Sequence, residues 1–438
     1  MKFTIYTFLI SMLFVQGARA QVENKLFQKP FRLKTGAEFI NVHESGHSAP
    51  YLYDINKDGK LDLLLGYYGR ERLETDTVRF GHCLTKGACK IYLNNGDNIK
   101  PEYAYHGEIQ AGNDRAFVPC DCCVGFVPAL ADINGDGIDD LVSGSFPGQA
   151  YFFKGKEDGN FEPFVFIRDT LGNALNPGHT TTVAPFDWDG DGLLDLVWGV
   201  RFKGVAVSRN VGTRKQAAFL TPEFIDIMPY TAGHEKVSSH TVPVDWNGDG
   251  RFDLVCGSES GDVFVCLNTG TAKEPKFDSK PEVLILNKRN HSKALVGENQ
   301  PNGYRSKLFV HDYNGDGKLD ILLGDVYTER EIFRELTSEE MMLKKQKETA
   351  ARGSKEERRA FFKPYYDFVD KESVKLMAAN SDLTESEAKG LAWNNLPVEM
   401  LSGLNKYLQE NKKKWAFLSD FKTQNSYLGG FVWVYIQK

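Results

Sequence analysis

One acidic unit occurs five times in the chain, and it constrains the fold more than any other feature. It reads Asp, any residue, Asp or Asn, any residue, Asp-Gly, two further residues and Asp-Leu, with Asp-Ile in the last copy. Repeats several tens of residues apart are typical of proteins in which each unit supplies one supersecondary element. The copies begin, in chain order, at Asp54, Asp132, Asp187, Asp245 and Asp312.

A segment of alternating apolar and polar residues follows each acidic unit. These segments read KIYLNNG, QAYFFKG, GVAVSRNVG, DVFVCLNTG and GFVWVYIQK. Such alternation indicates strands with one buried face. With one strand entering the acidic loop, one leaving it and an outer strand, each unit supplies about four strands, as in a propeller blade. We therefore predict an all-β protein, a β-propeller of about five four-stranded blades.

The last unit ends with the chain, after its third strand. The segment KPFRLKTGAEFINV, ahead of the first unit, could supply the missing outer strand and close the ring. A seven-bladed ring would require two blades without an acidic loop, and no interval is long enough to contain one. We predict that the propeller covers residues 21–329 and that residues 426–438 form its final strand.

The acidic units have the composition of a site for a hard cation. Side-chain oxygens at positions 1, 3, 5 and 9, with a backbone carbonyl at position 7, could converge on one ion, and glycine at position 6 permits the sharp turn. Calcium accepts six to eight oxygens in a loose shell, whereas magnesium requires a tight octahedron. We therefore predict about five calcium ions as cofactors.

The predicted calcium ligands occupy the same four positions in each unit. They are Asp54, Asn56, Asp58 and Asp62; Asp132, Asn134, Asp136 and Asp140; Asp187, Asp189, Asp191 and Asp195; Asp245, Asn247, Asp249 and Asp253; and Asp312, Asn314, Asp316 and Asp320. The alternative is a set of turns in which these side chains accept only local hydrogen bonds. Five copies in one register favour the cation, because carboxylates gathered this closely repel one another.

The acidic units and the strands that follow them resemble a known family. The five acidic units, such as DINGDGIDDL and DWDGDGLLDL, are each followed by a strand that often ends in Asn and Gly, and together they are similar to FG-GAP/VCBS repeats. Such repeats build the integrin-α type of β-propeller and occur in secreted bacterial proteins. The resemblance covers roughly residues 27–330 and 429–438. It implies calcium-stabilised blades and extracellular adhesion or ligand binding.

The segments ahead of the acidic units are rich in histidine and cysteine. Since they enter the innermost strands, we expect them to meet at the end of the channel opposite the acidic loops. Thiolate and imidazole are ligands for zinc or copper, so a second metal or redox site is one hypothesis. Its residues would be His47, Cys122, Cys123, His179 and His240. The alternative is a structural disulfide with histidines at a wet rim.

Two further cysteine pairs have open alternatives. Cys256 and Cys266 lie on adjacent predicted strands and could form a disulfide or remain packed thiols. Cys83 and Cys89 bracket a short loop that a disulfide would close.

Residues 330–425 lack the blade pattern and read as helices. Thr337 and Glu340 form a predicted capping box, and Gly353 is a predicted stop. We predict a helical insertion between the second and third strands of the last blade. It could form a cap that shapes a ligand site or a charged appendage that adds solubility.

The first twenty residues have the features of a secretory signal peptide. Lys2 precedes a short apolar run, and Ala18-Arg19-Ala20 forms a small-residue cleavage site. An uncleaved anchor is the alternative, but no later run approaches the roughly 18 apolar residues of a membrane span. We therefore expect a secreted, periplasmic or cell-surface protein without a transmembrane span.

These features predict a binding protein. The net charge of −6 argues against a nucleic-acid partner, which usually requires a basic face. We predict a secreted calcium-binding propeller that binds an extracellular protein or polysaccharide, without catalysis, opposite the calcium loops. Arg70, Arg72, Arg201 and Arg305 near that end could contact acidic sugars, and scattered surface arginines are the alternative. The alternative is a secreted enzyme that acts on polysaccharide or uses a metal or redox site at the Cys/His-rich mouth.

Overall fold

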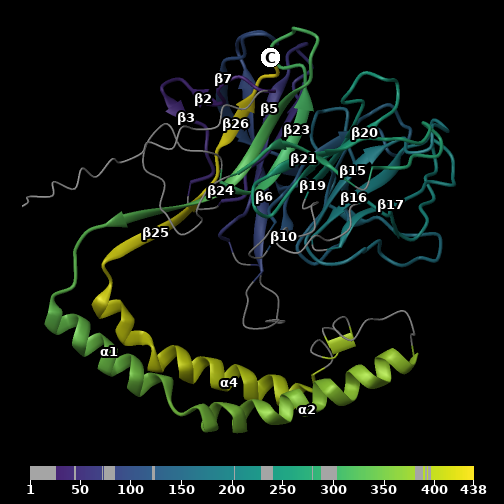
Figure 1. Cartoon of the computed structure of the whole chain (residues 1–438). Helices are drawn as coiled ribbons and strands as arrows, with labels where there is room; N and C mark the ends of the chain where they lie inside the picture. Colours follow the sequence, from purple (N-terminus) through teal and green to yellow (C-terminus); the bar gives the residue numbers. More distant parts are fainter. Residues whose placement is uncertain are drawn as a thin grey trace, which may run out of the picture.

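The chain folds into a β-propeller, seen in the computed structural model (Figure 1). Five antiparallel sheets of four or five strands are present in the described part of the chain. The structure describes residues 26–43, 46–71, 73, 84–120, 124–201, 203–227, 240–278, 280–287, 303–379, 388–389, 392 and 396–438.

The first three sheets follow one another along the chain. In each, an acidic loop joins the first two strands. The first sheet has β4 (Ala49–Tyr53), β5 (Asp62–Tyr67), β6 (Thr85–Asn94), β7 (Tyr103–Glu108) and β10 (Val118–Cys120); the second has β11 (Ala129–Ala131), β12 (Asp140–Ser143), β13 (Tyr151–Phe153) and β14 (Val165–Phe166); the third has β15 (Thr181–Phe186), β16 (Asp195–Val200), β17 (Gly204–Ser208) and β18 (Glu223–Phe224).

The last two sheets repeat this arrangement. The fourth has β19 (His240–Val244), β20 (Asp253–Gly257), β21 (Val263–Cys266) and β22 (Glu282–Ile285); the fifth has β23 (Tyr304–His311), β24 (Asp320–Ile332), β25 (Gln424–Gly429), β26 (Val432–Tyr435) and β1 (Phe31–Arg32). Two small hairpins flank the sheets: β2 (Lys34–Thr35) with β3 (Glu38–Phe39), and β8 (Gln110–Ala111) with β9 (Asp114–Arg115). The five sheets match the five acidic loops, and five blades in total stays our prediction.

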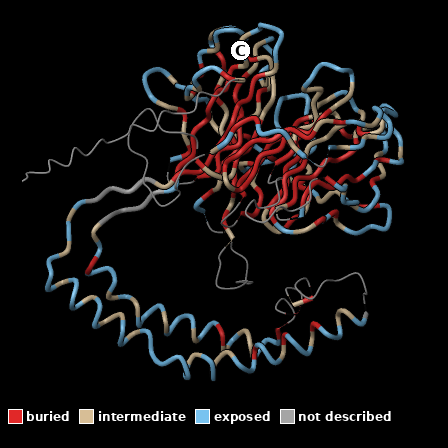
Figure 2. Tube along the Cα trace, in the orientation of Figure 1, coloured by how far each residue is buried: buried red, intermediate tan, exposed pale blue. Residues whose placement is uncertain are grey.

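The core lies between neighbouring sheets (Figure 2). The second strand of a sheet is buried along its whole length in β5, β12, β16 and β20, because sheets cover both of its faces. Apolar side chains of adjacent sheets form shared clusters, such as Leu130 and Leu141 of the second sheet with Leu64 of the first. This burial explains the apolar D-L-x-x-G segments that follow the acidic loops.

A glycine at the end of the second strand lets adjacent sheets approach closely. A Cβ atom added to Gly66 would lie 1.9 Å from the carbonyl oxygen of Phe126 in the connection to the second sheet. The equivalent atom on Gly324 would lie 2.0 Å from the carbonyl oxygen of Ser48. Gly144 and Gly257 occupy the same position and would place a Cβ within 2.4 Å of the following sheet, and at Gly199 the Cα atom of His240 in the following sheet would lie 3.1 Å away. The glycine of each repeat is therefore required by packing between sheets.

The N-terminal segment completes the fifth sheet. Strand β1 pairs with β26 in antiparallel register, with Phe31 opposite Val434 and Arg32 opposite Trp433. The segment ahead of the first acidic loop thus provides the outer strand of the sheet that ends the chain. The innermost strands β23 and β4 are in contact, so the fifth sheet lies against the first.

A buried carboxylate anchors this closure. Asp325 is 1% exposed and accepts hydrogen bonds from the backbone N–H groups of Gly303 and Phe431 and from Nε1 of Trp433, the last at 2.8 Å. The Ser48 hydroxyl donates to the Phe431 carbonyl at 2.7 Å. The bonds made by Phe431 and Trp433 connect segments more than 100 residues apart.

A helical hairpin lies beyond the end of the sheets away from the acidic loops (Figure 1). It contains α1 (Ser338–Arg352), α2 (Lys355–Ala379), α4 (Val398–Lys414) and the 3-10 helix η1 (Ala416–Phe421). The predicted capping box of Thr337 and Glu340 is present at the start of α1. The rings of Phe361 and Tyr407 stack at 4.0 Å and join α2 to α4.

These helices lie between β24 and β25, inside the predicted insertion at 330–425. The limits of the predicted segments stay predictions, and residues 1–20 lie outside the described residues. None of the helices in the described ranges has the length and apolar composition needed to cross a membrane.

Candidate metal loops and channel mouth

The five acidic loops lie at one end of the propeller. Each loop joins the first strand of a sheet to the second, and its position-9 aspartate is the first residue of that second strand, as Asp195 is in β16. Since the innermost strands run in the same sense around the ring, the ends of the second strands lie at the opposite end. We call that end the mouth; it comprises the two residues after each D-L-x-x-G glycine and the residues that lead into each first strand.

In each loop, the side chain of the position-1 aspartate accepts hydrogen bonds from backbone N–H groups of the same loop. Asp54 accepts hydrogen bonds from the backbone N–H groups of Asp58 at 3.0 Å and Gly59 at 2.8 Å. The same pair of bonds is made by Asp132, Asp187, Asp245 and Asp312. The local hydrogen bonds of the turn alternative are thus present, and each carboxylate oxygen retains a lone pair with which it could bind a cation.

The position-9 aspartate ties the loop to the third strand. One oxygen of Asp195 accepts from the N–H of Trp188 at 2.9 Å, and the other from the N–H of Asn210 at 2.6 Å. All five position-9 aspartates make both types of bond and are at most 1% exposed: Asp62, Asp140, Asp195, Asp253 and Asp320. This link between loop and third strand is a function of position 9 that we did not predict.

Burial disfavours the ionised form of these carboxylates when no cation is bound. Burial raises the pKa of Asp140 and of Asp195 to about 6, and the backbone N–H donors oppose this shift. The pKa values of Asp62, Asp253 and Asp320 are raised for the same reason. A bound divalent cation would favour the charged form of all five.

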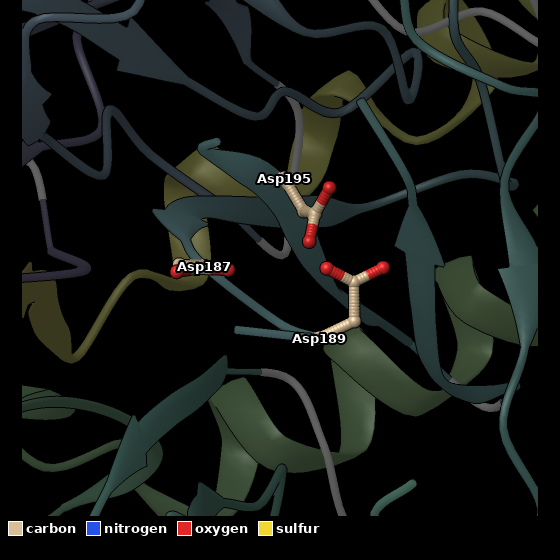
Figure 3. A group of neighbouring side chains, drawn as sticks. All are labelled: Asp187, Asp189 and Asp195. Carbon is tan, nitrogen blue, oxygen red and sulfur yellow. The ribbon is translucent and has the colours of Figure 1, made fainter. Parts of the chain in front are cut away.

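The third loop brings three carboxylates together. One oxygen from each of Asp187, Asp189 and Asp195 lies within 4.8 Å of the others, and Figure 3 shows Asp189 and Asp195 facing one another. The Oδ1 atom of Asp189 is buried and has no hydrogen-bond partner. An orphaned carboxylate oxygen in such a group fits a cation, because burying an unpaired acceptor is otherwise costly. Among the described residues this is the one group of three or more acidic, His or Cys side chains within that distance.

The other four loops have asparagine at position 3. In the first loop the Asn56 amide donates to Asp58 at 3.1 Å, and in the second the Asn134 amide donates to Asp140. An amide contributes one neutral oxygen where Asp189 contributes a charged one. The third loop is therefore the strongest candidate for a tight site.

A cavity of about 590 Å³ adjoins the third loop. Its lining includes Trp188, Asp191 and Arg209, with Lys273 and Glu274 from the following sheet. The Arg209 guanidinium lies 3.1 Å from Oδ2 of Asp189. This cation offsets part of the negative charge of the loop.

At the mouth, five residues hold the same position in their sheets. Each follows the glycine of D-L-x-x-G by two residues; four of them lie just beyond their second strand, and the fifth lies within the longer β24. They are Tyr68, Phe146, Arg201, Glu259 and Val326. Because the sheets surround one channel, the five equivalent positions lie around its mouth.

Charged side chains connect four sheets at the mouth. Oε2 of Glu259 lies 2.9 Å from the Arg201 guanidinium and 3.2 Å from that of Arg305. Arg305 in turn lies 3.2 Å from Nε2 of His47, whose ring is 5.7 Å from that of Tyr68. We call Arg201, Glu259 and Arg305 the mouth cluster. Lys307, two residues after Arg305, is buried, which lowers its pKa to about 8.

The histidines predicted at the mouth contact different partners. His179 lies 6.3 Å from Phe146, and Nδ1 of the buried His240 accepts the N–H of Leu308 at 3.0 Å. Burial lowers the pKa of His240 to about 3, so it is neutral near pH 7. In the part of the chain that the structure describes, no histidine joins a group of three metal-ligating side chains. Cys122 and Cys123 lie outside the described residues, so the second metal site stays a prediction.

The described cysteines include three buried free thiols, those of Cys89, Cys256 and Cys266. Cys256 lies opposite Phe264 in the sheet, and Cys266 opposite Leu254, so the two cysteines are diagonal neighbours. Their hydrogen bond, with burial, raises the pKa of the Cys266 thiol well above its usual range. The structure thus shows the packed-thiol alternative here. A Cys83–Cys89 disulfide is absent, since Cys89 is a free thiol, and Cys83 is outside the described residues.

Sequence reasoning did not single out Glu259. Its only signal is its place in GSESG, two residues after the repeat glycine, where the third sheet has Arg201. Aligning the five repeats on that glycine would have found the opposite charges in adjacent sheets. The sequence analysis noted the asparagines at or just after the ends of three third strands but did not predict their role: Asn94 accepts N–H bonds from Gly96 and Glu102 and so fixes the turn to the outer strand.

Comparison with known proteins supports the repeat assignment. The FG-GAP-like repeat family matches residues 132–198 and 245–323. No curated protein matches the chain.

Two solved structures show partial similarity. One is a lectin from Agrocybe aegerita described as recognising non-reducing terminal N-acetylglucosamine, with 21% identity and a TM-score of 0.31 over 64% of this chain and 63% of that one. The other is a β-fructofuranosidase from Schwanniomyces occidentalis, with 9% identity and a TM-score of 0.38 over 73% and 62%. The chain thus spans less than two thirds of the length of each of these two proteins.

Proposed function

We propose that this FG-GAP repeat β-propeller is a secreted protein whose acidic loops bind calcium and that it binds an extracellular protein or polysaccharide, without catalysis, at the mouth. The observation that carries the calcium proposal is the third loop. There, one carboxylate oxygen each of Asp187, Asp189 and Asp195 lie within 4.8 Å of one another, and the Oδ1 atom of Asp189 is buried without a hydrogen-bond partner.

Positions 1, 3, 5 and 9 of each loop would hold the ion. The ion would supply positive charge to carboxylates whose burial already disfavours their ionised form. Oxygen ligands on a glycine-containing loop suit calcium better than magnesium, which requires a tighter octahedron. Each ion would stiffen the connection between the first two strands of a blade, and so support the mouth at their far end.

Calorimetric titration of the metal-stripped full-length protein with Ca²⁺ tests this proposal. We expect binding at about five sites, with Mg²⁺ at least roughly tenfold weaker because it loses its water reluctantly. The variant Asp189→Asn, which gives the third loop the asparagine of the other four, should weaken the tightest site about tenfold, a loss of about 1.4 kcal/mol.

The matched control is Asp226→Asn, an exposed aspartate near the end of the same sheet, which should leave every site unchanged. Absence of Ca²⁺ binding heat in the wild type would contradict the proposal. Turnover of a bound polysaccharide would support the enzyme alternative instead.

A further inference from the structure

Glu259 combines two properties that rarely occur together. Its side chain is 6% exposed, and its Oε1 atom is buried and has no hydrogen-bond partner. Yet the same carboxylate contacts two guanidinium groups through Oε2. An unpaired buried acceptor costs free energy, so its persistence indicates a partner supplied from outside the chain.

The neighbours of Glu259 decide what kind of partner fits. A metal cation is disfavoured, because one carboxylate stands beside Arg201, Arg305 and the ammonium of Lys307. An anion is disfavoured at Oε1, because this atom belongs to a negatively charged carboxylate and can only accept hydrogen bonds. A neutral hydroxyl group meets both requirements, because it can donate a hydrogen bond to Oε1 and accept one from a guanidinium.

The surroundings suit a ligand with several hydroxyl groups. Arg201 and Arg305 keep 20% and 18% of their side-chain surface exposed, so the mouth cluster borders solvent. Tyr68 and Phe146 hold the equivalent positions in the first two sheets and could offer aromatic faces to the ring carbons of a sugar.

The backbone at the mouth is also strained. His47, Thr180 and Arg305 each have a φ of 59°, which is unfavourable for residues other than glycine. Each leads into or begins the first strand of its sheet. Backbone strain of this kind concentrates at sites where a side chain must be held in one place for function.

We propose that the mouth cluster binds a neutral carbohydrate, with Glu259 Oε1 accepting a sugar hydroxyl and Arg201 and Arg305 donating to adjacent oxygens. This inference rests on the proposed binding function of the mouth and narrows its ligand to a polysaccharide or glycan. It does not depend on which metal the loops bind.

Calorimetry with calcium-loaded, full-length protein tests it. The probes are cello-, xylo- and manno-oligosaccharides, with alginate oligosaccharides of equal length as the acidic arm. We expect at least one neutral series to bind at micromolar to millimolar concentration. Glu259→Gln should weaken that binding at least tenfold, because it replaces one acceptor oxygen by a donor. Glu282→Gln, an exposed glutamate of β22 in the same sheet, is the matched control and should change nothing.

Arg201→Lys provides a second test that keeps the charge. It removes the planar guanidinium fork, and we expect about fivefold weaker binding with unchanged folding and calcium content. Binding of no neutral oligosaccharide, binding of alginate only, or neutral binding unaffected by both variants would overturn the inference. Loss of Ca²⁺ binding in the wild type would instead refute the proposed loop function, so the two failures are distinguishable.

Discussion

Replacing Asp325 by alanine should destabilise the propeller by about 5 kcal/mol, because three buried donors would lose their acceptor at a typical cost of about 1 to 3 kcal/mol each. The donors are the N–H groups of Gly303 and Phe431 and Nε1 of Trp433. They belong to the start of the fifth sheet and to its third strand at the end of the chain. The substitution therefore weakens the sheet that the N-terminal strand completes.

Urea unfolding at pH 7 in the presence of calcium measures this loss. Asp325→Asn keeps an acceptor oxygen and should cost less than Asp325→Ala. The exposed Asp226→Ala should change the free energy of unfolding by less than about 0.5 kcal/mol. An Asp325→Ala protein as stable as the Asp226→Ala control would show that this carboxylate does not anchor the closure.

Gly66→Ala should cost about 3 kcal/mol, at the upper end of typical overpacking penalties, because the new methyl group meets backbone. Its carbon would lie 1.9 Å from the Phe126 carbonyl oxygen, so the first and second sheets would have to move apart. A flexible side chain could yield at this distance, but a peptide group held between two strands cannot.

The comparison for Gly66→Ala is Gly36→Ala. Gly36 has a φ of 57° with no atom within 4 Å of an added Cβ, so its substitution should cost only the roughly 1 to 2 kcal/mol of a left-handed residue. Unfolding curves of both variants, recorded under the same conditions, separate the free-energy cost of the steric clash from the cost of a left-handed backbone conformation. Equal losses would argue against close packing through the repeat glycine.

The local pattern of the chain was enough to predict the repeat, the strands and the propeller. The acidic unit recurs in one register, and alternation marks the third strand, as in GVAVSRN for β17. The prediction that only one face of that strand is buried was wrong for β17, which is buried along its whole length. The capping box at Thr337 was equally readable, because it depends on residues three positions apart. These features require only near neighbours in sequence.

The mouth cluster could not be predicted in the same way. Arg201, Glu259 and Arg305 come from three sheets, and their contacts span 46 residues or more. Arg201 and Arg305 were noted as separate arginines near the mouth, but no spacing rule joins them to a glutamate in GSESG. The orphaned oxygens of Asp189 and Glu259 likewise depend on burial, which a sequence pattern does not give.

Position 9 of the loops shows how one residue can serve both fold and function. Asp195 was predicted as a cation ligand, and the structure shows that it also accepts two backbone N–H bonds that join loop and third strand. A cation there would stabilise an arrangement that the backbone has already formed. Calcium should therefore strengthen the folded protein more than it reshapes it.

The melting temperature of the full-length protein with calcium and after exhaustive EDTA treatment tests the central claim most directly. With several sites near saturation, each contributing about 2.7 kcal/mol at a hundredfold excess over Kd, we predict a fall of at least about 10 °C on calcium removal. Added Ca²⁺ should restore the original value, and equal Mg²⁺ should not. An unchanged melting temperature, together with no bound calcium by elemental analysis, would contradict the account.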